Sequence, residues 1–293
     1  MIYLAESGST KCDAVFLTNE GEEIKRIRTI GFNPYFHDEQ FVAQEIIKVP
    51  EIAELGGQVD QVYFYGAGCS TPELNAIIAQ GLKAGFPIAE IQVGHDLKAS
   101  AYATWDGLAQ ITCILGTGSN CVYYDGAKLQ AGRSGYGFII GDEGSASYIG
   151  KKLVQAYLYR QMSEALCNEF ETTFGVDEHI IREKVYAPQG ANVFLGGFAP
   201  FAHKHIDHPF FYQLVFNGFR EFVETQVLPF PNSRKVPISF VGSIAHHFEP
   251  VLKDVLHFFD LQAGKVIRRP VDGLIEYYRR YIMNYQNVNH GNH

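Results

Sequence analysis

The first third of the chain alternates short apolar segments with glycine-containing or polar turns. Apolar residues at 2–6 and 14–17, and alternating apolar and basic residues at 24–30, predict three successive strands. The rest of this half predicts, in order, a helix at 41–47 that Pro50 interrupts, a strand at 61–65, a helix from Thr71 and Pro72, a strand at 88–93 and a helix at 97–105. The order is therefore βββαβαβα.

The second half of the chain repeats this order around a long helical insertion at about 150–230. Its predicted elements are strands at 111–115, 121–124, 128–131, 238–241 and 265–268, a helix near 251–256 and a last helix from about 271. A loop containing glycine and proline is expected at 190–200. The sequence lacks a clear residue-level repeat, so the duplication is inferred from topology alone.

Length and composition favour a two-domain globular protein. The chain has 293 residues, of which 46% are hydrophobic and 19% charged, enough apolar material for two cores. We expect one α/β domain over residues 1–106 and a second over 107–271.

Charge and segment lengths argue against several classes of partner. Lys+Arg 24 against Asp+Glu 32 gives a net charge of −8, without the basic footprint of a nucleic-acid binder. Apolar stretches fall short of the ~20 residues that cross a membrane, and the N-terminus shows no basic leader. The five cysteines form no CxxC pair and are typical of reduced thiols. We therefore expect a cytoplasmic protein that binds neither nucleic acid nor membrane.

Two turns of small residues stand at equivalent places in the two halves. They are Ser7-Gly8-Ser9-Thr10 and Gly116-Thr117-Gly118-Ser119. One such turn alone is commonly just a hairpin. Two of them can bring backbone N–H groups and hydroxyls onto a polyphosphate, with Gly242-Ser243 at a third strand end.

Two common phosphate motifs are absent. The form GxxxxGK[ST] fails because Gly144 and Gly150 are one residue too far apart. A dinucleotide fingerprint fails because a strand, not a helix, follows Gly118. A nucleotide would therefore bind to this chain in neither the Walker nor the Rossmann mode.

Acidic residues follow two glycine-containing segments, and each allows two interpretations. Asp96, between a strand and a helix, can be an N-cap or a base that takes a proton from a hydroxyl. Asp142 and Glu143 lie in a glycine-rich segment before a helix, where they can offset its dipole or accept sugar hydroxyls.

The histidines give weaker evidence of a functional site than the acidic residues. His203, His205 and His208 resemble metal-ligand spacing, but no cysteine cluster or HExxH motif accompanies them. We expect a solvated loop there, and a helix start at His246 and His247.

Together these motifs resemble the N-acetylglucosamine kinases of the BadF/BadG-type ATPase family, in the sugar kinase and actin-like superfamily. The resemblance covers nearly the whole chain. It rests on residues 6–11, Gly94-His95-Asp96, residues 115–121, Gly135-Tyr136-Gly137, residues 141–146 and Val241-Gly242-Ser243.

The resemblance implies two ribonuclease-H-like domains that close around ATP and a sugar in an interdomain cleft. The last helix, at about 272–285, would pack back on the first domain. By this likeness Asp96 is the catalytic base, and Glu6 lies near Mg²⁺, through water. The implied sugar ligands are Asn33, Thr117, Asn120 and Asp142, and the implied nucleotide and phosphate ligands are Gly8, Ser9, Thr10, Lys11, Gly116, Thr117, Gly118, Gly242 and Ser243.

The leading hypothesis is an ATP- and Mg²⁺-dependent kinase that phosphorylates the 6-hydroxyl of an amino sugar, foremost N-acetylglucosamine. Glucosamine, N-acetylmannosamine and N-acetylmuramic acid present similar hydroxyls. The alternatives are a non-catalytic nucleotide or sugar sensor and an ATPase that drives a partner protein. Zinc and iron–sulfur motifs of related families are missing, and the resemblance suggests a homodimer.

Overall fold

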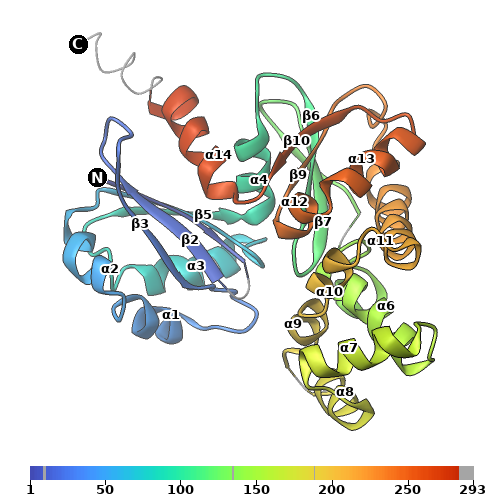
Figure 1. Cartoon of the computed structure of the whole chain (residues 1–293). Coiled ribbons are helices and arrows are strands. Elements are labelled where there is room, and N and C mark those ends of the chain that lie inside the picture. Colours follow the sequence, from blue (N-terminus) through green and yellow to red (C-terminus); the bar gives the residue numbers. More distant parts are fainter. Residues whose placement is uncertain (9–10, 134, 188, 284–293) are drawn as a thin grey trace. The chain divides into compact units, whose positions relative to one another are not determined.

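The computed structural model describes residues 1–8, 11–133, 135–187 and 189–283 (Figure 1). Ser9 and Thr10, two of the predicted phosphate ligands, lie outside these residues, as do residues 284–293. The chain forms two compact units. One holds Met1–Trp105 with the C-terminal segment from Arg269, and the other holds Asp106–Arg268.

The first unit is built on a five-stranded mixed sheet in the order β3-β2-β1-β4-β5. β1 pairs antiparallel with β2 and parallel with β4, which pairs parallel with β5. The strands are β1 (Ile2–Ser7), β2 (Lys11–Leu17), β3 (Glu23–Ile30), β4 (Gln61–Gly66) and β5 (Glu90–His95). The predicted strand at 88–93 thus lies two residues further on, because the sheet register pairs His95 with Gly66.

Helices of the first unit begin where the chain supplies caps. The side chain of Thr71 accepts the N–H of Leu74, and Pro72 occupies the first turn. Pro50, expected to interrupt a helix, begins a new one. The helices are α1 (Glu39–Ile46), α2 (Pro50–Leu55), the short 3₁₀ helix η1 (Gly56–Gln58), α3 (Pro72–Leu82), α4 (Asp96–Thr104) and α14 (Pro270–Tyr277), which runs on as the π-helix η3 (Tyr278–Met283).

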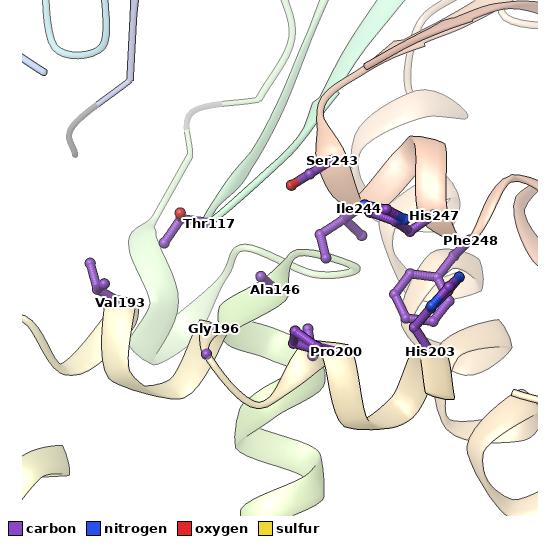
Figure 2. A pocket seen from close by; sticks show the side chains of 12 residues that line it. Thr117, Ala146, Val193, Gly196, Pro200, His203, Ser243, Ile244, His247 and Phe248 are labelled. Carbon is purple, nitrogen blue, oxygen red and sulfur yellow. The ribbon is translucent and has the colours of Figure 1, made fainter. Parts of the chain in front are cut away.

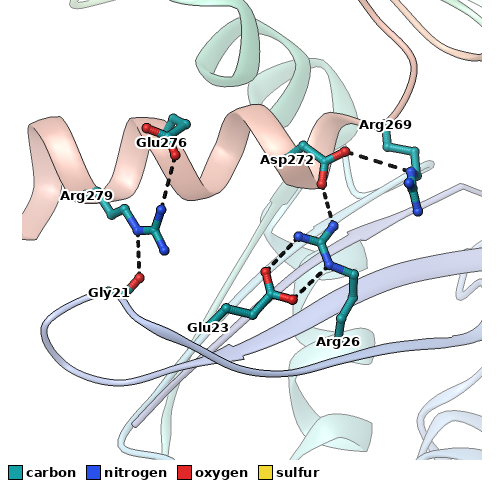
Figure 3. A network of polar contacts seen from close by, with 7 residues as sticks. All are labelled: Gly21, Glu23, Arg26, Arg269, Asp272, Glu276 and Arg279. Atoms are coloured by element: carbon teal, nitrogen blue, oxygen red, sulfur yellow. Dashed lines mark hydrogen bonds and ion pairs between the residues drawn. The ribbon is translucent and has the colours of Figure 1, made fainter.

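Helix α14 returns from the end of the chain to the first unit and packs on α4. Their backbones approach so closely that a Cβ on Gly273 would lie 2.3 Å from the carbonyl oxygen of Ala103. Arg26 of β3 bonds to both Glu23 and Asp272, and Nε of Arg279 donates to Gly21 O at 2.7 Å (Figure 3).

Tyrosines of α14 and η3 also contact the rest of the first unit. The rings of Tyr102 and Tyr277 stack with centroids 4.1 Å apart. The hydroxyls of Tyr65 and Tyr278 are buried and lie 2.6 Å apart. This combination of ring stacking and a buried hydrogen bond stabilises the C-terminal helix on the sheet.

The second unit has a five-stranded mixed sheet in the order β10-β9-β6-β7-β8. β6 pairs antiparallel with β7 and parallel with β9. The strands are β6 (Gln110–Leu115), β7 (Ser119–Tyr124), β8 (Leu129–Ala131), β9 (Ile238–Val241) and β10 (Ala263–Ile267).

Helices fill most of the chain between β8 and β9. They are α5 (Gly137–Ile140), α6 (Ala146–Leu158), α7 (Glu164–Phe174), α8 (Glu178–Val185), α9 (Ala191–Gly196), α10 (Ala199–Lys204), α11 (Pro209–Phe222) and the π-helix η2 (Val223–Val227); α12 (Ser243–His247) and α13 (Glu249–Phe258) follow β9.

The loop expected at 190–200 was wrong. That segment forms α9 and the start of α10, because Pro200 lies in the first turn of α10, where no intrahelical N–H is needed. Leu195 and Phe198 are buried in the core of this unit. Within the described residues, helices long and apolar enough to cross a bilayer are absent.

Candidate functional site

In the first unit, three parallel strands end at the same edge of the sheet. Ser7 of β1 lies opposite Gly66 of β4, and Gly66 lies opposite His95 of β5. Asp96 follows as the first residue of α4. Strand ends of this kind are where ligands bind in open α/β sheets.

Asp96 is not the N-cap of α4, which settles one of the alternatives left open by the sequence. The cap is His95, whose Nδ1 accepts the N–H of Leu97 at 3.2 Å. Oδ1 of Asp96 is buried beside that same nitrogen. Nδ1 of His95 lies 2.7 Å from that oxygen, and although burial lowers the pKa of His95, the Asp96 carboxylate shifts the net pKa upward.

Glu6 shares this edge with two other carboxylates. Burial raises its pKa to about 8, and the charges of Asp96 and Asp13 add to the rise, while Lys11 opposes it. Asp13 lies opposite Glu6 on β2 and is paired with Arg28 at 2.7 Å. A cation near Glu6 would relieve this crowding of negative charge.

The residues fit magnesium better than a metal held wholly by protein. The described residues contain no group of three or more His, Cys, Asp or Glu side chains arranged to hold a metal ion. Mg²⁺ commonly keeps several waters and takes one or two carboxylates plus substrate phosphates. Glu6, with the Asp96 carboxylate close enough to raise its pKa, suits such a site.

The turn between β1 and β2 is tied to the segment that carries Asn33. Gly8 N donates to Lys11 O at 3.0 Å, and Oγ of Ser7 accepts the N–H of Phe32 at 2.9 Å. Gly31 is required here, since a Cβ on it would lie 2.0 Å from Gly8 O. Asn33 is buried, and its Oδ1 accepts the N–H of Tyr35 at 3.0 Å.

The equivalent turn of the second unit, between β6 and β7, contains two unsatisfied donors. Gly116 N donates to Gly118 O at 3.0 Å, but the N–H groups of Thr117 and Gly118 donate to no acceptor among the described residues. The carbonyls of Gly116 and Thr117 accept the N–H groups of Ala146 and Ser147, which fixes the turn on the start of α6. Two adjacent free N–H groups on a fixed turn can bind an anion.

Asp142 and Asn120 join this turn from either side. Oδ1 of Asp142 accepts the N–H of Ser119 at 3.2 Å, and Asp142 itself has a φ of +56°. Burial raises the pKa of Asp142; the Ser119 N–H opposes the rise, Glu143 adds to it and Lys151 opposes it. Asn120, directly after Ser119, accepts the N–H of Cys121 at 2.9 Å through Oδ1. The structure thus brings Asp142 to the turn that contains Thr117, and Asn120 directly follows the residue that Asp142 contacts.

Gly242 places the end of β9 beside the same turn. Its φ is +119°, and a Cβ there would lie 2.3 Å from Leu115 O. Only glycine allows this approach, and it brings Ser243 next to the turn that follows Leu115.

A cavity of about 390 Å³ lies in the second unit beside these residues (Figure 2). Thr117 and Ser243, both predicted from the sequence, contribute to its wall. The other lining residues are Ala146, Val193, Gly196, Gly197, Ala199, Pro200, His203, Ile244, His247 and Phe248. The five at 193–200 were missed, because their segment had been interpreted as a loop and their small or apolar side chains carry no chemical signature.

The histidine expectations were wrong in part: His205 and His208 do lie between helices, at the C-cap of α10 and the N-cap of α11. His203 lies in α10, not in a solvated loop, and lines the cavity. His246 and His247 lie at the end of α12, not at a helix start. The rings of His203 and His247 lie 5.1 Å apart, a proximity that sequence spacing could not reveal.

Known structures resemble this chain over nearly its full length. A protein of Porphyromonas gingivalis, described as a "Putative N-acetylglucosamine Kinase", is 37% identical; the match covers 96% of this chain and 99% of that one, with a TM-score of 0.90. The chain belongs to the N-acetylglucosamine kinase family. The membership confirms the resemblance found in the sequence motifs.

More distant structures share the fold alone. A protein of the same description from Chromobacterium violaceum is 16% identical, with a TM-score of 0.71 over 94% of this chain and 98% of that one. A glucokinase of the ROK family from Streptomyces griseus, solved with glucose and AMPPNP, is 13% identical, with a TM-score of 0.53 over 94% and 97%. No family model and no curated protein sequence matches the chain.

Proposed function

We propose that the chain is an ATP-dependent sugar kinase that transfers the γ-phosphoryl group to the 6-hydroxyl of an amino sugar, foremost N-acetylglucosamine. The chain belongs to a kinase family, and one observation in its structure supports this proposal. Among the described residues, the fixed turn at Gly116–Gly118 has two N–H groups without an acceptor, and it lies beside a cavity. An anion such as a nucleotide phosphate is the ligand that adjacent free N–H groups prefer.

Asp96 is the proposed base. Its buried Oδ1 lies 2.7 Å from Nδ1 of His95, which can orient the carboxylate. We propose that this carboxylate accepts a hydrogen bond from a substrate hydroxyl and takes the proton as attack on phosphorus develops. Asn33, Asn120, Asp142 and Thr117 are proposed to orient the sugar.

The phosphates are proposed to bind at the two small-residue turns. The N–H groups of Thr117 and Gly118 would offset charge on the transferring group, as positioned donors do in phosphoryl transfer. Gly8 and Lys11 of the first unit, with Gly242 and Ser243 of the second, complete the proposed set. Bound Mg²⁺, placed near Glu6, would supply further neutralisation of the phosphate charge.

Replacement of Asp96 by Asn tests the base. We expect Asp96→Asn to bind the sugar nearly as well as the wild type and to lose roughly 10²–10⁴-fold in kcat, the usual contribution of a general base. Asp13→Asn is the matched control, because Asp13 belongs to the same carboxylate cluster but is already paired with Arg28. The control should keep most of its turnover.

The measurement is ADP release with ATP, Mg²⁺ and N-acetylglucosamine, followed by identification of the phosphorylated carbon by NMR. Wild-type turnover in Asp96→Asn would overturn the assignment of the base. A phosphate on a hydroxyl other than the 6-hydroxyl would overturn the proposed regiochemistry while leaving the kinase activity intact.

A further inference from the structure

Helix α5, which immediately precedes Gly141 and Asp142, is too short to be stable by itself. It has four residues, Gly137–Ile140, none of which is buried, and the side chains of Ile139 and Ile140 are 73% and 75% exposed. An isolated helix needs roughly 12–15 residues to be even marginally stable in water. Contacts from elsewhere in the chain must therefore hold α5 in place.

Lys151, in the second turn of α6, makes such a contact. Its Nζ donates to Phe138 O at 2.8 Å and to Ile139 O at 3.4 Å. The last carbonyls of a helix lack donors within the helix, and a lysine side chain can satisfy them. The ring of Tyr148, one turn earlier on α6, lies 5.8 Å from the same nitrogen, and its hydroxyl donates to Glu221 of α11.

The segment that follows α5 carries a proposed sugar ligand in an uncommon backbone conformation. Asp142 has a φ of +56°, a region that residues other than glycine seldom adopt. Its Oδ1 accepts the N–H of Ser119, and its carbonyl accepts the N–H of Ser145 at 3.1 Å. Because one residue, Gly141, separates α5 from Asp142, a shift of α5 would move this carboxylate.

Lys151 also acts on Asp142 through its charge. Burial lowers the pKa of Lys151 and the neighbouring Lys152 lowers it further, while Asp142, Glu143 and Glu221 oppose the fall and so favour the ammonium form. Oε2 of Glu143 is buried and has no hydrogen-bond partner among the described residues, so a nearby positive charge offsets its own. In return, Lys151 opposes the rise that burial causes in the pKa of Asp142.

We propose that Lys151 is a positioning residue for the acceptor sugar, which holds α5 against α6 and thereby fixes Asp142 in place and in its charged form. This inference rests on the proposed kinase function and adds to its sugar side a residue that does not itself touch the substrate. A carboxylate accepts hydrogen bonds from sugar hydroxyls better than a carboxylic acid does, so both effects favour sugar binding.

Four proteins test this role: wild type, Lys151→Met, Lys151→Arg and Lys152→Met. Lys152→Met is the matched control, because Lys152 is exposed and lies 5.4 Å from the same Tyr148 ring, while the hydrogen bonds to α5 come from Lys151. The measurements are kcat and KM for N-acetylglucosamine and ATP at acidic and neutral pH, and the sugar Kd by calorimetry. Hydrogen exchange of peptides covering 137–144 reports on the tether without any need for activity.

We expect the sugar KM and Kd of Lys151→Met to rise roughly 10-fold or more, as for the loss of a hydrogen bond to a charged group. Both kcat and the KM for ATP should change less, because the lost contact supports sugar binding rather than the transition state alone. The defect should grow as the pH falls, since without the Lys151 charge the pKa of Asp142 rises further and its carboxylate is lost at higher pH.

Peptides covering 137–144 should exchange faster in Lys151→Met. Lys151→Arg keeps the charge and donors that reach the α5 carbonyls, so it should recover most of the sugar affinity and of the protection from exchange. Lys152→Met should match the wild type in every measurement.

Wild-type sugar affinity in Lys151→Met, or an equal loss in Lys152→Met, would overturn the role. Equal losses in kcat and in both KM values, shared by Lys151→Arg, would show general damage to the fold and would also overturn it. A wild type that neither binds the sugar nor releases ADP would overturn the proposed function instead, and hydrogen exchange would still decide whether Lys151 holds α5.

Discussion

Gly242→Ala should damage the second unit at the point where β9 meets the phosphate turn. The glycine has φ +119° and ψ 167°, a region that only glycine populates readily. The added Cβ would lie 2.3 Å from the carbonyl oxygen of Leu115 and 2.9 Å from its carbon. Both are backbone atoms of β6, so the clash cannot be relieved by rotation of a side chain.

The residue cannot easily move, because it is hydrogen-bonded on both sides. Gly242 N donates to Ile267 O at 2.9 Å, and Gly242 O accepts the N–H of His246 at 3.1 Å. Backbone strain of this kind costs about 1–3 kcal/mol, and overpacking adds a similar amount. We therefore expect a loss of about 2–5 kcal/mol in the free energy of unfolding.

Urea denaturation followed by circular dichroism measures that loss, and hydrogen exchange of peptides spanning β6, β9 and α12 locates it. Gly116→Ala is the control, since among the described residues no atom beyond its chain neighbours lies within 4 Å of the added Cβ, and its φ is not in the left-handed region. Its stability should stay within about 0.5 kcal/mol of the wild type. Equal stability of Gly242→Ala, Gly116→Ala and wild type would refute the reasoning.

Three further predictions concern single side chains. Because the pKa of Glu6 rises from 4.5 to about 8 in the folded chain, the folded state holds the proton more tightly than the unfolded state. The free energy of unfolding of the ligand-free protein should therefore fall, by at most about 5 kcal/mol, as pH rises through that interval. Glu6→Gln should flatten a plot of the free energy of unfolding against pH. Tyr278→Phe should cost about 1–3 kcal/mol in urea denaturation by leaving the buried Tyr65 hydroxyl unpaired, whereas Tyr65→Phe combined with it should recover much of that loss; an equally unstable double variant would contradict this. Asp142→Asn keeps a residue type that tolerates φ +56° and should raise the KM for the sugar more than it lowers thermal stability, which paired kinetic and melting measurements would check.

Local sequence signals were sufficient for the strands and for several helix starts. Residues 238–241 were predicted at their observed bounds, and Thr71 with Pro72 gave a helix start that the cap geometry confirms. These signals succeed because they depend on residues a few positions apart. Asp96 could be placed at a strand end but not distinguished from a cap, since the choice depends on whether His95 takes the capping role.

The cavity could not be predicted, because it depends on contacts distant in sequence. Its wall joins residues after β6, in α9 and α10, and after β9. Gly196 and Ala199 give no pattern that differs from an ordinary helix or loop, and the loop at 190–200 was inferred from glycine and proline content alone. The rings of His203 and His247 lie close together only because the fold brings α10 and α12 together.

The most direct test of the kinase assignment is ADP release by the purified protein with ATP and Mg²⁺ across a panel of N-acetylated amino sugars, unmodified amino sugars and hexoses, beside a reaction without sugar. We predict turnover that depends on sugar and is fastest with N-acetylglucosamine. Folded protein that releases no ADP with any sugar, or releases it equally without sugar, would contradict the assignment.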